Sequence, residues 1–152
     1  MKPFEVKLVL PVVVPLLEVI KEVIQDLKSS LAVPGDSVPA ADAELSEAWH
    51  SELLTGQRGD LELFMSLFGD EFINEGIIAF DGSNAEAVIR SCSAVRLRLR
   101  EHYLKNLGDE ALEAGDVELD KLADPLRKAF MCYLFLATLQ ELIISRIDDA
   151  AP

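Results

Sequence analysis

A few polar side chains lie on or beside apolar helical stripes, and their types are the ones that could do chemistry. Asn84 opens a predicted helix, and Arg96 lies on the shoulder of the apolar stripe of that helix. Gln140 and Glu141 interrupt the most apolar stretch of the chain. A charge on a buried helix must be paired or neutralised. We therefore predict a buried polar network in which Glu141 pairs with Arg96 or Arg100 from the facing helix.

This cluster has two interpretations. The first is a core ion pair that stabilises the fold and does nothing else. The second is a small-molecule or metal-binding site, in which His102 and Tyr133 supply ligand contacts beside Arg96 and Glu141. A deep pocket lined by these side chains would favour the second interpretation, whereas a solid core at that point would favour the first.

Patterns typical of metal binding and catalysis are scarce. Di-iron carboxylate bundles need Glu-x-x-His on two helices. This spacing occurs at Glu47 and His50, but His102 has no acid three residues before it. The chain has no Gly-x-Ser-x-Gly nucleophile elbow, and the glycines at 56 and 59 predict a turn rather than a phosphate-binding loop. We therefore predict a protein that is not an enzyme, with no catalytic residue, no metal and no cofactor.

Helical periodicity dominates the chain and must position these side chains. Residues 129–140 carry no charge, so a helix there is apolar almost all the way round. Such a helix belongs in the centre of a bundle or in an interface. The pattern predicts helices at 16–31, 45–55, 60–69, 83–107 and 129–147, with one further turn at 110–115. Ser83 and Glu86 have the spacing of a capping box for the fourth of these.

Two short segments have strand character. Phe4 to Leu10 alternates in part and is rich in β-branched residues, which predicts a short N-terminal strand that ends at Pro11. Ile77–Phe80 fits either a helical turn or a strand that pairs with the first one. The predicted fold is mainly α: a single-domain helical bundle over residues 1–152, with five to six helices and a short N-terminal strand.

Composition sets limits on location and partners. The chain has 152 residues, half of them hydrophobic, and a net charge of −13. So acidic a chain is unsuited to neutralising phosphates, which argues against nucleic acid and anionic membrane surfaces as partners. No uninterrupted apolar run reaches the length of a membrane span. The N-terminal apolar run, Leu8 to Leu17, contains two prolines, and charged residues crowd the segment after it where a signal peptide would be cleaved. We therefore expect a cytoplasmic protein, with Cys92 and Cys132 reduced in its core.

Two kinds of protein partner are consistent with this pattern. The apolar last helix offers more hydrophobic surface than one small bundle needs, which indicates a homodimer. Eleven acidic residues against one arginine lie between Asp36 and Asp81, a local charge of −10. Such a segment can be a solvated surface or a docking face for a basic protein. We expect a non-enzymatic interaction or regulatory module.

Three motifs, taken in order, resemble a family of bacterial proteins of unknown function. They are Pro11 between a strand and an apolar helix, Ser83-Asn84-Ala85 leading to Arg96-Leu97-Arg98-Leu99, and Tyr133-Leu134 leading to Leu139-Gln140-Glu141-Leu142-Ile143-Ile144. The resemblance implies a cytoplasmic, mostly helical domain without known catalytic activity. Genes of that family often lie near one for a Clp-protease adaptor, which suggests regulated proteolysis. The chain departs from the family at Met131-Cys132-Tyr133, where an aromatic-Gln-Trp run is expected.

Overall fold

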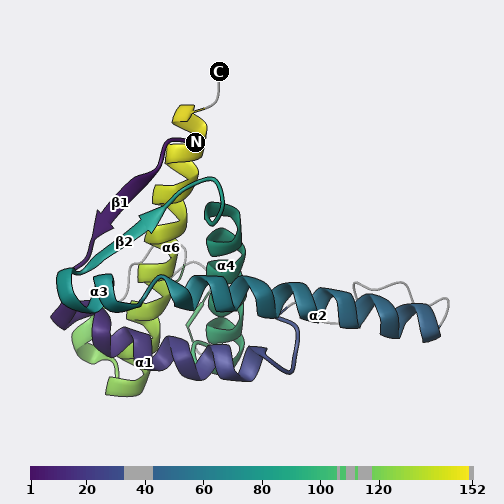
Figure 1. Cartoon of the computed structure of the whole chain (residues 1–152). Helices are drawn as coiled ribbons and strands as arrows, with labels where there is room; N and C mark the ends of the chain where they lie inside the picture. The colour runs from purple at the N-terminus through teal and green to yellow at the C-terminus, as the bar shows by residue number, and fades with distance from the viewer. Residues whose placement is uncertain (33–42, 106, 109–111, 113–117, 151–152) are drawn as a thin grey trace.

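The described part of the chain is mainly helical and carries one short two-stranded sheet (Figure 1). A computed structural model describes residues 1–32, 43–105, 107–108, 112 and 118–150. Its elements, in order, are β1 (Phe4–Lys7), α1 (Leu10–Leu27), α2 (Ala43–Ser66), α3 (Asp70–Glu75), β2 (Ile77–Phe80), α4 (Ala85–His102), the 3-10 turn η2 (Leu119–Lys121) and α6 (Asp124–Ala150). Helical character is thus confirmed, but the predicted five to six helices are not quite matched, since within these residues four helices are long and α3 has six residues.

The main difference lies in α2, where the sequence predicted two helices separated by a turn. The structure has one helix of 24 residues that runs through Gly56 and Gly59. A helical glycine costs only about 1 kcal/mol relative to alanine. The buried side chains of the following turns, Leu61 and Phe64, supply more than this by packing on the core. The glycines are therefore tolerated inside a helix instead of ending it.

Helix α1 begins earlier and ends earlier than predicted. It starts at Leu10 and includes both Pro11 and Pro15, so that Pro15 lies inside the helix rather than at its start. Proline is accepted without cost in the first turn, where the N–H groups have no helical partner. Pro15 is one turn further on and removes a single hydrogen bond. The seven buried residues of α1 lie on one face, which explains why packing dominates over this loss.

The charge-free helix is central, as predicted. Helix α6 packs against α4 and α1, and its residues Phe130, Leu136 and Ile143 are fully buried in a single hydrophobic core. By length and composition alone, residues Asp124–Asp148 could also cross a membrane. A core helix of a soluble protein passes the same test, and 39% of the most apolar window of this stretch is buried inside the molecule.

The two strands pair antiparallel, so Ile77–Phe80 is a strand and not a helical turn. Phe4 lies opposite Phe80, and Lys7 lies opposite Ile77. The backbone enters β2 through Gly76, which ends α3 with a φ of +74°. Its carbonyl accepts the Leu8 N–H at 2.7 Å, which fixes the register of the pair. The predicted loop at 33–39 lies outside the described residues, as does the predicted turn at 110–115 apart from residue 112.

Candidate functional site

Arg96 of α4 is the centre of the first polar cluster. Its Nη1 donates to Gln140 Oε1 at 2.6 Å and its Nη2 donates to the Tyr133 hydroxyl at 3.1 Å. The guanidinium carbon also lies 4.6 Å from the centroid of the Tyr133 ring, a cation–π distance. Two residues of α6 therefore hold one arginine of α4.

Gln140 completes this cluster from the other side. Its Nε2 donates to the Ile89 carbonyl at 2.8 Å and to Ser93 Oγ at 2.7 Å. The residue is only 6% exposed, and Tyr133 is buried too. The polar atoms of the Gln140 amide thus have partners within the protein. A packed and hydrogen-bonded junction between α4 and α6 favours the structural interpretation of this cluster over a ligand site.

Glu141 does not take the predicted place in this cluster. Its side chain is exposed, and no hydrogen bond or ion pair joins it to Arg96 or Arg100 within the part of the chain described. Neighbouring residues on an α-helix point about 100° apart. The face of α6 that turns Gln140 toward α4 therefore turns Glu141 to solvent. The neutral amide, and not the carboxylate, is the partner of Arg96.

Asn84 and His102 lie at the two ends of α4 and do not join the cluster. Asn84 Oδ1 accepts the Asp81 N–H at 3.0 Å, and its Nδ2 donates to the Ala79 carbonyl at 3.1 Å. This ties the end of β2 to the start of α4. His102 is exposed in the last helical turn, and no described contact joins it to Tyr133. The predicted ligand contacts His102 and Tyr133 are thus not brought together.

The predicted capping box also does not form. The side chain of Ser83 donates to Asp81 Oδ1 instead, as does its backbone N–H at 2.8 Å. These hydrogen bonds favour the charged carboxylate and lower the pKa of Asp81. Asn84, and not Ser83, precedes the first helical residue, because the turn after β2 is closed by Asp81.

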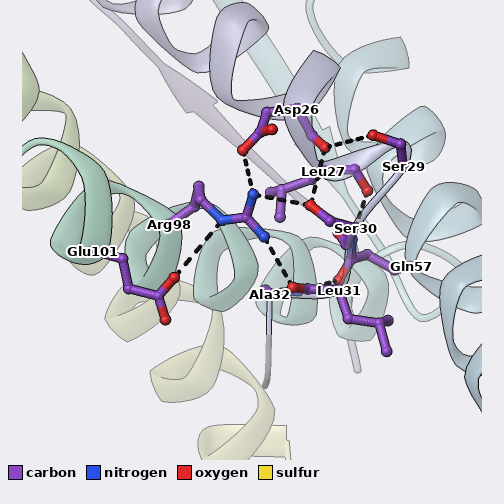
Figure 2. Close-up of polar contacts among 9 residues, drawn as sticks. All are labelled: Asp26, Leu27, Ser29, Ser30, Leu31, Ala32, Gln57, Arg98 and Glu101. Carbon is purple, nitrogen blue, oxygen red and sulfur yellow. Dashed lines mark hydrogen bonds and ion pairs between the residues drawn. The ribbon is translucent and has the colours of Figure 1, made fainter. Parts of the chain in front are cut away.

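A second polar cluster, which the sequence did not predict, surrounds Arg98 (Figure 2). The Arg98 side chain is only 6% exposed and pairs with Asp26 of α1. Its Nη1 also donates to Ser30 Oγ at 3.0 Å, and its Nη2 donates to the Leu31 carbonyl at 2.9 Å. Glu101 lies 4.0 Å from its Nε. One buried arginine of α4 therefore holds the C-terminal end of α1.

Helix α2 reaches the same chain end through Gln57. Its Nε2 donates to the carbonyls of Leu27 and Ser30 at 2.7 and 2.9 Å, and its Oε1 accepts the Ala32 N–H at 3.0 Å. The last carbonyls of a helix lack partners in the helix itself. Gln57 supplies such a partner to the Leu27 carbonyl, and Arg98 holds Asp26, Ser30 and Leu31 beside it. Both α2 and α4 therefore contact the C-terminal end of α1 and the residues that follow it (Figure 2). We call this set of contacts the α1 clamp.

One sequence signal could have revealed the buried position of Arg98. Ala87, Ser91 and Ala94 precede it at steps of four, three and four residues, and all four are buried. A row of small residues at helical spacing lets another helix approach closely. An arginine in such a row is placed to reach the backbone of that helix.

The third feature is a surface formed by the exposed half of α2. Figure 1 shows this half extending beyond the other described helices and strands. We call residues 43–53 the arm. Leu45, Trp49 and Leu53 follow one another at four-residue steps along it and are 60%, 49% and 42% exposed. Residues at this spacing lie on one face of a helix. The arm therefore presents an apolar row to solvent.

At its base the arm borders a groove between α2, α4 and the end of α1. The groove has a volume of about 600 Å³, and its lining is largely apolar, with side chains of Leu31, Leu53, Leu61, Ile89, Ala94 and Leu97. An ion pair bridges it, since Arg90 of α4 meets both carboxylate oxygens of Asp60 of α2 at 2.8 and 2.9 Å. Neither Arg96 nor Tyr133 lines the groove. The groove therefore meets the first polar cluster only at Ile89 and Ser93, which line the groove and accept hydrogen bonds from Gln140.

Titratable groups offer little chemistry in the described residues. No group of three or more His, Cys, Asp or Glu residues there could hold a metal ion. Burial raises the pKa of both cysteine thiols from 9.0 to about 12. Cys132 Sγ donates to the Leu16 carbonyl at 3.4 Å, and both cysteines are free. Their thiolates are therefore almost absent near neutral pH.

We expect Cys92 and Cys132 to react with an aromatic disulfide reagent at pH 8 only when the protein unfolds. A thiolate is the reacting species, and the raised pKa depletes it in the folded state. The folded protein binds the thiol protons more tightly than the unfolded chain does. The stability that this tighter proton binding contributes is lost as pH rises from 9 toward about 12. Absorbance at pH 8 with and without denaturant measures both thiols. Fast labelling of the native protein would contradict the burial described.

In comparisons with protein-family models, curated proteins and solved structures, nothing matches this chain. The resemblance to the bacterial family and its link to regulated proteolysis thus stay predictions. Function has to be argued from the surfaces of the molecule.

Proposed function

We propose that this chain is a non-enzymatic, cytoplasmic protein-interaction or regulatory module that acts as a homodimer. The observation that supports the interaction module is the apolar surface made by the arm and the groove. Leu53 belongs to both, so one bound helix can cover the arm row and the groove together. Exposed apolar surface of this kind, bordered by polar residues, marks sites of protein association.

The row on α2 supports binding of a helix in particular. The four-residue steps from Leu45 through Trp49 and Leu53 continue to Gln57 and Leu61. Leu61 is fully buried against the rest of the molecule, whereas the row becomes progressively more exposed toward Leu45. The arm therefore prolongs a surface that already packs inside the protein. Tryptophan at the centre of such a row is typical of residues that dominate binding energy.

Charge indicates the chemistry of the partner. Glu47 and Glu52 of the arm are exposed, and Glu52 also lines the groove. The rim arginine Arg90 is already paired with Asp60. A helix with an apolar stripe and basic flanks would complement both the row and these carboxylates. This is the basic partner that the acidic segment Asp36 to Asp81 led us to expect.

The experiment uses Trp49, the single tryptophan of the chain, as its own reporter. The probe is a synthetic amphipathic helix of leucine and lysine, about 18 residues long, which spans five turns. We expect a blue shift of Trp49 fluorescence on titration, and an affinity that weakens as salt rises. Leu53→Asp should lower the affinity at least about tenfold, because a charge would be buried in the contact.

Two sets of charge reversals provide the matched comparison. Glu47→Lys together with Glu52→Lys removes the acidic flank of the arm and should abolish binding of the lysine-rich helix. Lysines at Glu71 and Glu75 change charge on α3 alone, away from the groove lining, and should leave most of the affinity in place. Equal losses in the two variants would mean that only net charge matters, and the proposed site would be wrong.

A further inference from the structure

We propose that the open edge of β1 pairs antiparallel with β1 of a second copy, and that the dimer therefore contains a continuous four-stranded sheet. The two-fold axis passes beside Val6. This inference rests on the proposed homodimer and names its interface. In the described residues the sheet has two strands, and Figure 1 shows β1 on the side of the sheet away from α4.

The backbone groups of β1 point alternately to β2 and to the open edge of the strand. Leu8 donates its N–H to Gly76, in register with the β1–β2 pair. In an antiparallel ladder, alternate residues bond to the same neighbouring strand. The N–H and C=O groups of Leu8, Val6 and Phe4 therefore point to β2, and those of Glu5 and Lys7 point to the open edge. An exposed strand edge of this kind is a template for another strand.

The outward backbone groups limit the register in which a second β1 can pair. A second β1 must place Glu5 or Lys7 opposite Glu5 or Lys7, because only these residues direct backbone groups outward. Centring the pair on Val6 sets each Glu5 opposite Lys7 of the second copy and forms opposite-charge pairs twice. Centring it on Glu5 or on Lys7 sets like charges opposite each other. Opposite-charge pairs stabilise a sheet, and like charges directly opposite destabilise it.

The side chains on the two faces fit this register. Glu5 and Lys7 are exposed, so their ion pairs form on the solvent face of the sheet. Phe4 and Val6 are half-buried and lie on the face that packs against the core. Val6 would contact Val6 of the second copy at a non-hydrogen-bonded position, where the strands approach most closely. Pro3, which has no N–H, limits the ladder to the two Glu5–Lys7 pairs.

Glu5→Pro tests the interface without changing the β1–β2 ladder. Proline removes the outward N–H at position 5, whereas the groups that bond to β2 belong to the neighbouring residues. We expect sedimentation velocity to show a dimer for the native protein and an increase of at least about tenfold in its dissociation constant for the variant. Circular dichroism should show unchanged helix content.

Exchanging the charges of Glu5 and Lys7 tests the Val6-centred register, apart from whether the edges of β1 pair at all. Glu5→Lys alone sets lysine opposite lysine twice and should weaken the dimer, as should Lys7→Glu alone. The double exchange of Glu5→Lys and Lys7→Glu restores both pairs and should restore the dimer. Val6→Cys should also cross-link two copies under mild oxidation, because non-hydrogen-bonded positions bring the Cα atoms to about 4.5 Å, within disulfide range.

The outcomes distinguish this inference from the homodimer itself. A native protein that stays monomeric up to the concentrations of the binding assay would overturn both. A dimer that persists unchanged in Glu5→Pro and in the single charge variants would overturn the β1 interface and leave the homodimer standing. A dimer lost in Glu5→Pro but insensitive to charge exchange would overturn the Val6-centred register.

Discussion

Replacing Arg98 with methionine is expected to lower the free energy of unfolding by about 3 kcal/mol. Methionine keeps the length of the buried stem but removes every polar contact of the guanidinium. The ion pair with Asp26 and the hydrogen bonds to Ser30 Oγ and the Leu31 carbonyl are lost together. The Leu31 carbonyl loses a charge-assisted partner in a half-buried position, which is the costly part of the change.

Urea unfolding monitored by circular dichroism measures this effect. Arg90→Met is the matched control, because Arg90 also lies on α4 and also forms an arginine–carboxylate pair. Its side chain is largely exposed, so the control should lose less than about 1 kcal/mol. Comparable losses in the two variants would show that the α1 clamp adds nothing beyond a surface ion pair.

Apolar periodicity predicted the helical framework and the central helix, because the spacing of apolar residues follows directly from the local repeat of a helix. Helices α4 and α6 were expected to pack on each other, and they do. The pairing of Ile77–Phe80 with β1 was left open, since four apolar residues fit a strand or a helical turn equally well. The pairing depends on Gly76, whose left-handed conformation turns the chain back toward Leu8.

The polar contacts were predicted less well, because they depend on helix rotation to within one residue. Arg96, Gln140 and Tyr133 were all candidate residues, and the structure joins them. The expected partner Glu141 is one position away from Gln140 and faces solvent. Sequence chemistry favours an arginine–glutamate pair, but the apolar stripe of α6 decides which residue turns toward α4.

The α1 clamp and the groove were not predicted, because both depend on how α1, α2 and α4 pack against one another in three dimensions. Arg98 fits an exposed charge in an alternating Arg-Leu run, and only the crossing of α1 over α4 makes it a buried residue. The groove likewise depends on α2 running unbroken past Gly56. Two separate helices, as expected, would have placed Leu53 and Leu61 on different elements.

Gly76→Ala is expected to lower the free energy of unfolding by about 3 kcal/mol. The residue has a φ of +74°, which side chains disfavour, and an added Cβ would lie 2.6 Å from the Leu8 carbonyl oxygen. Backbone must move to relieve this contact, and the nearest backbone is the link from β1 to α1. The hydrogen bond from Leu8 to Gly76 would weaken as it moves.

Gly59→Ala makes the same chemical change with the opposite expected sign. Gly59 lies inside α2, and a Cβ there meets nothing within 4 Å. Alanine should raise the free energy of unfolding by about 0.5–1 kcal/mol through its better helix propensity. Thermal unfolding of both variants should therefore move the midpoint in opposite directions. A loss below about 1 kcal/mol for Gly76→Ala would mean that the β1–β2 pair tolerates a shifted Leu8, and the register from which the dimer edge was derived would lose its anchor.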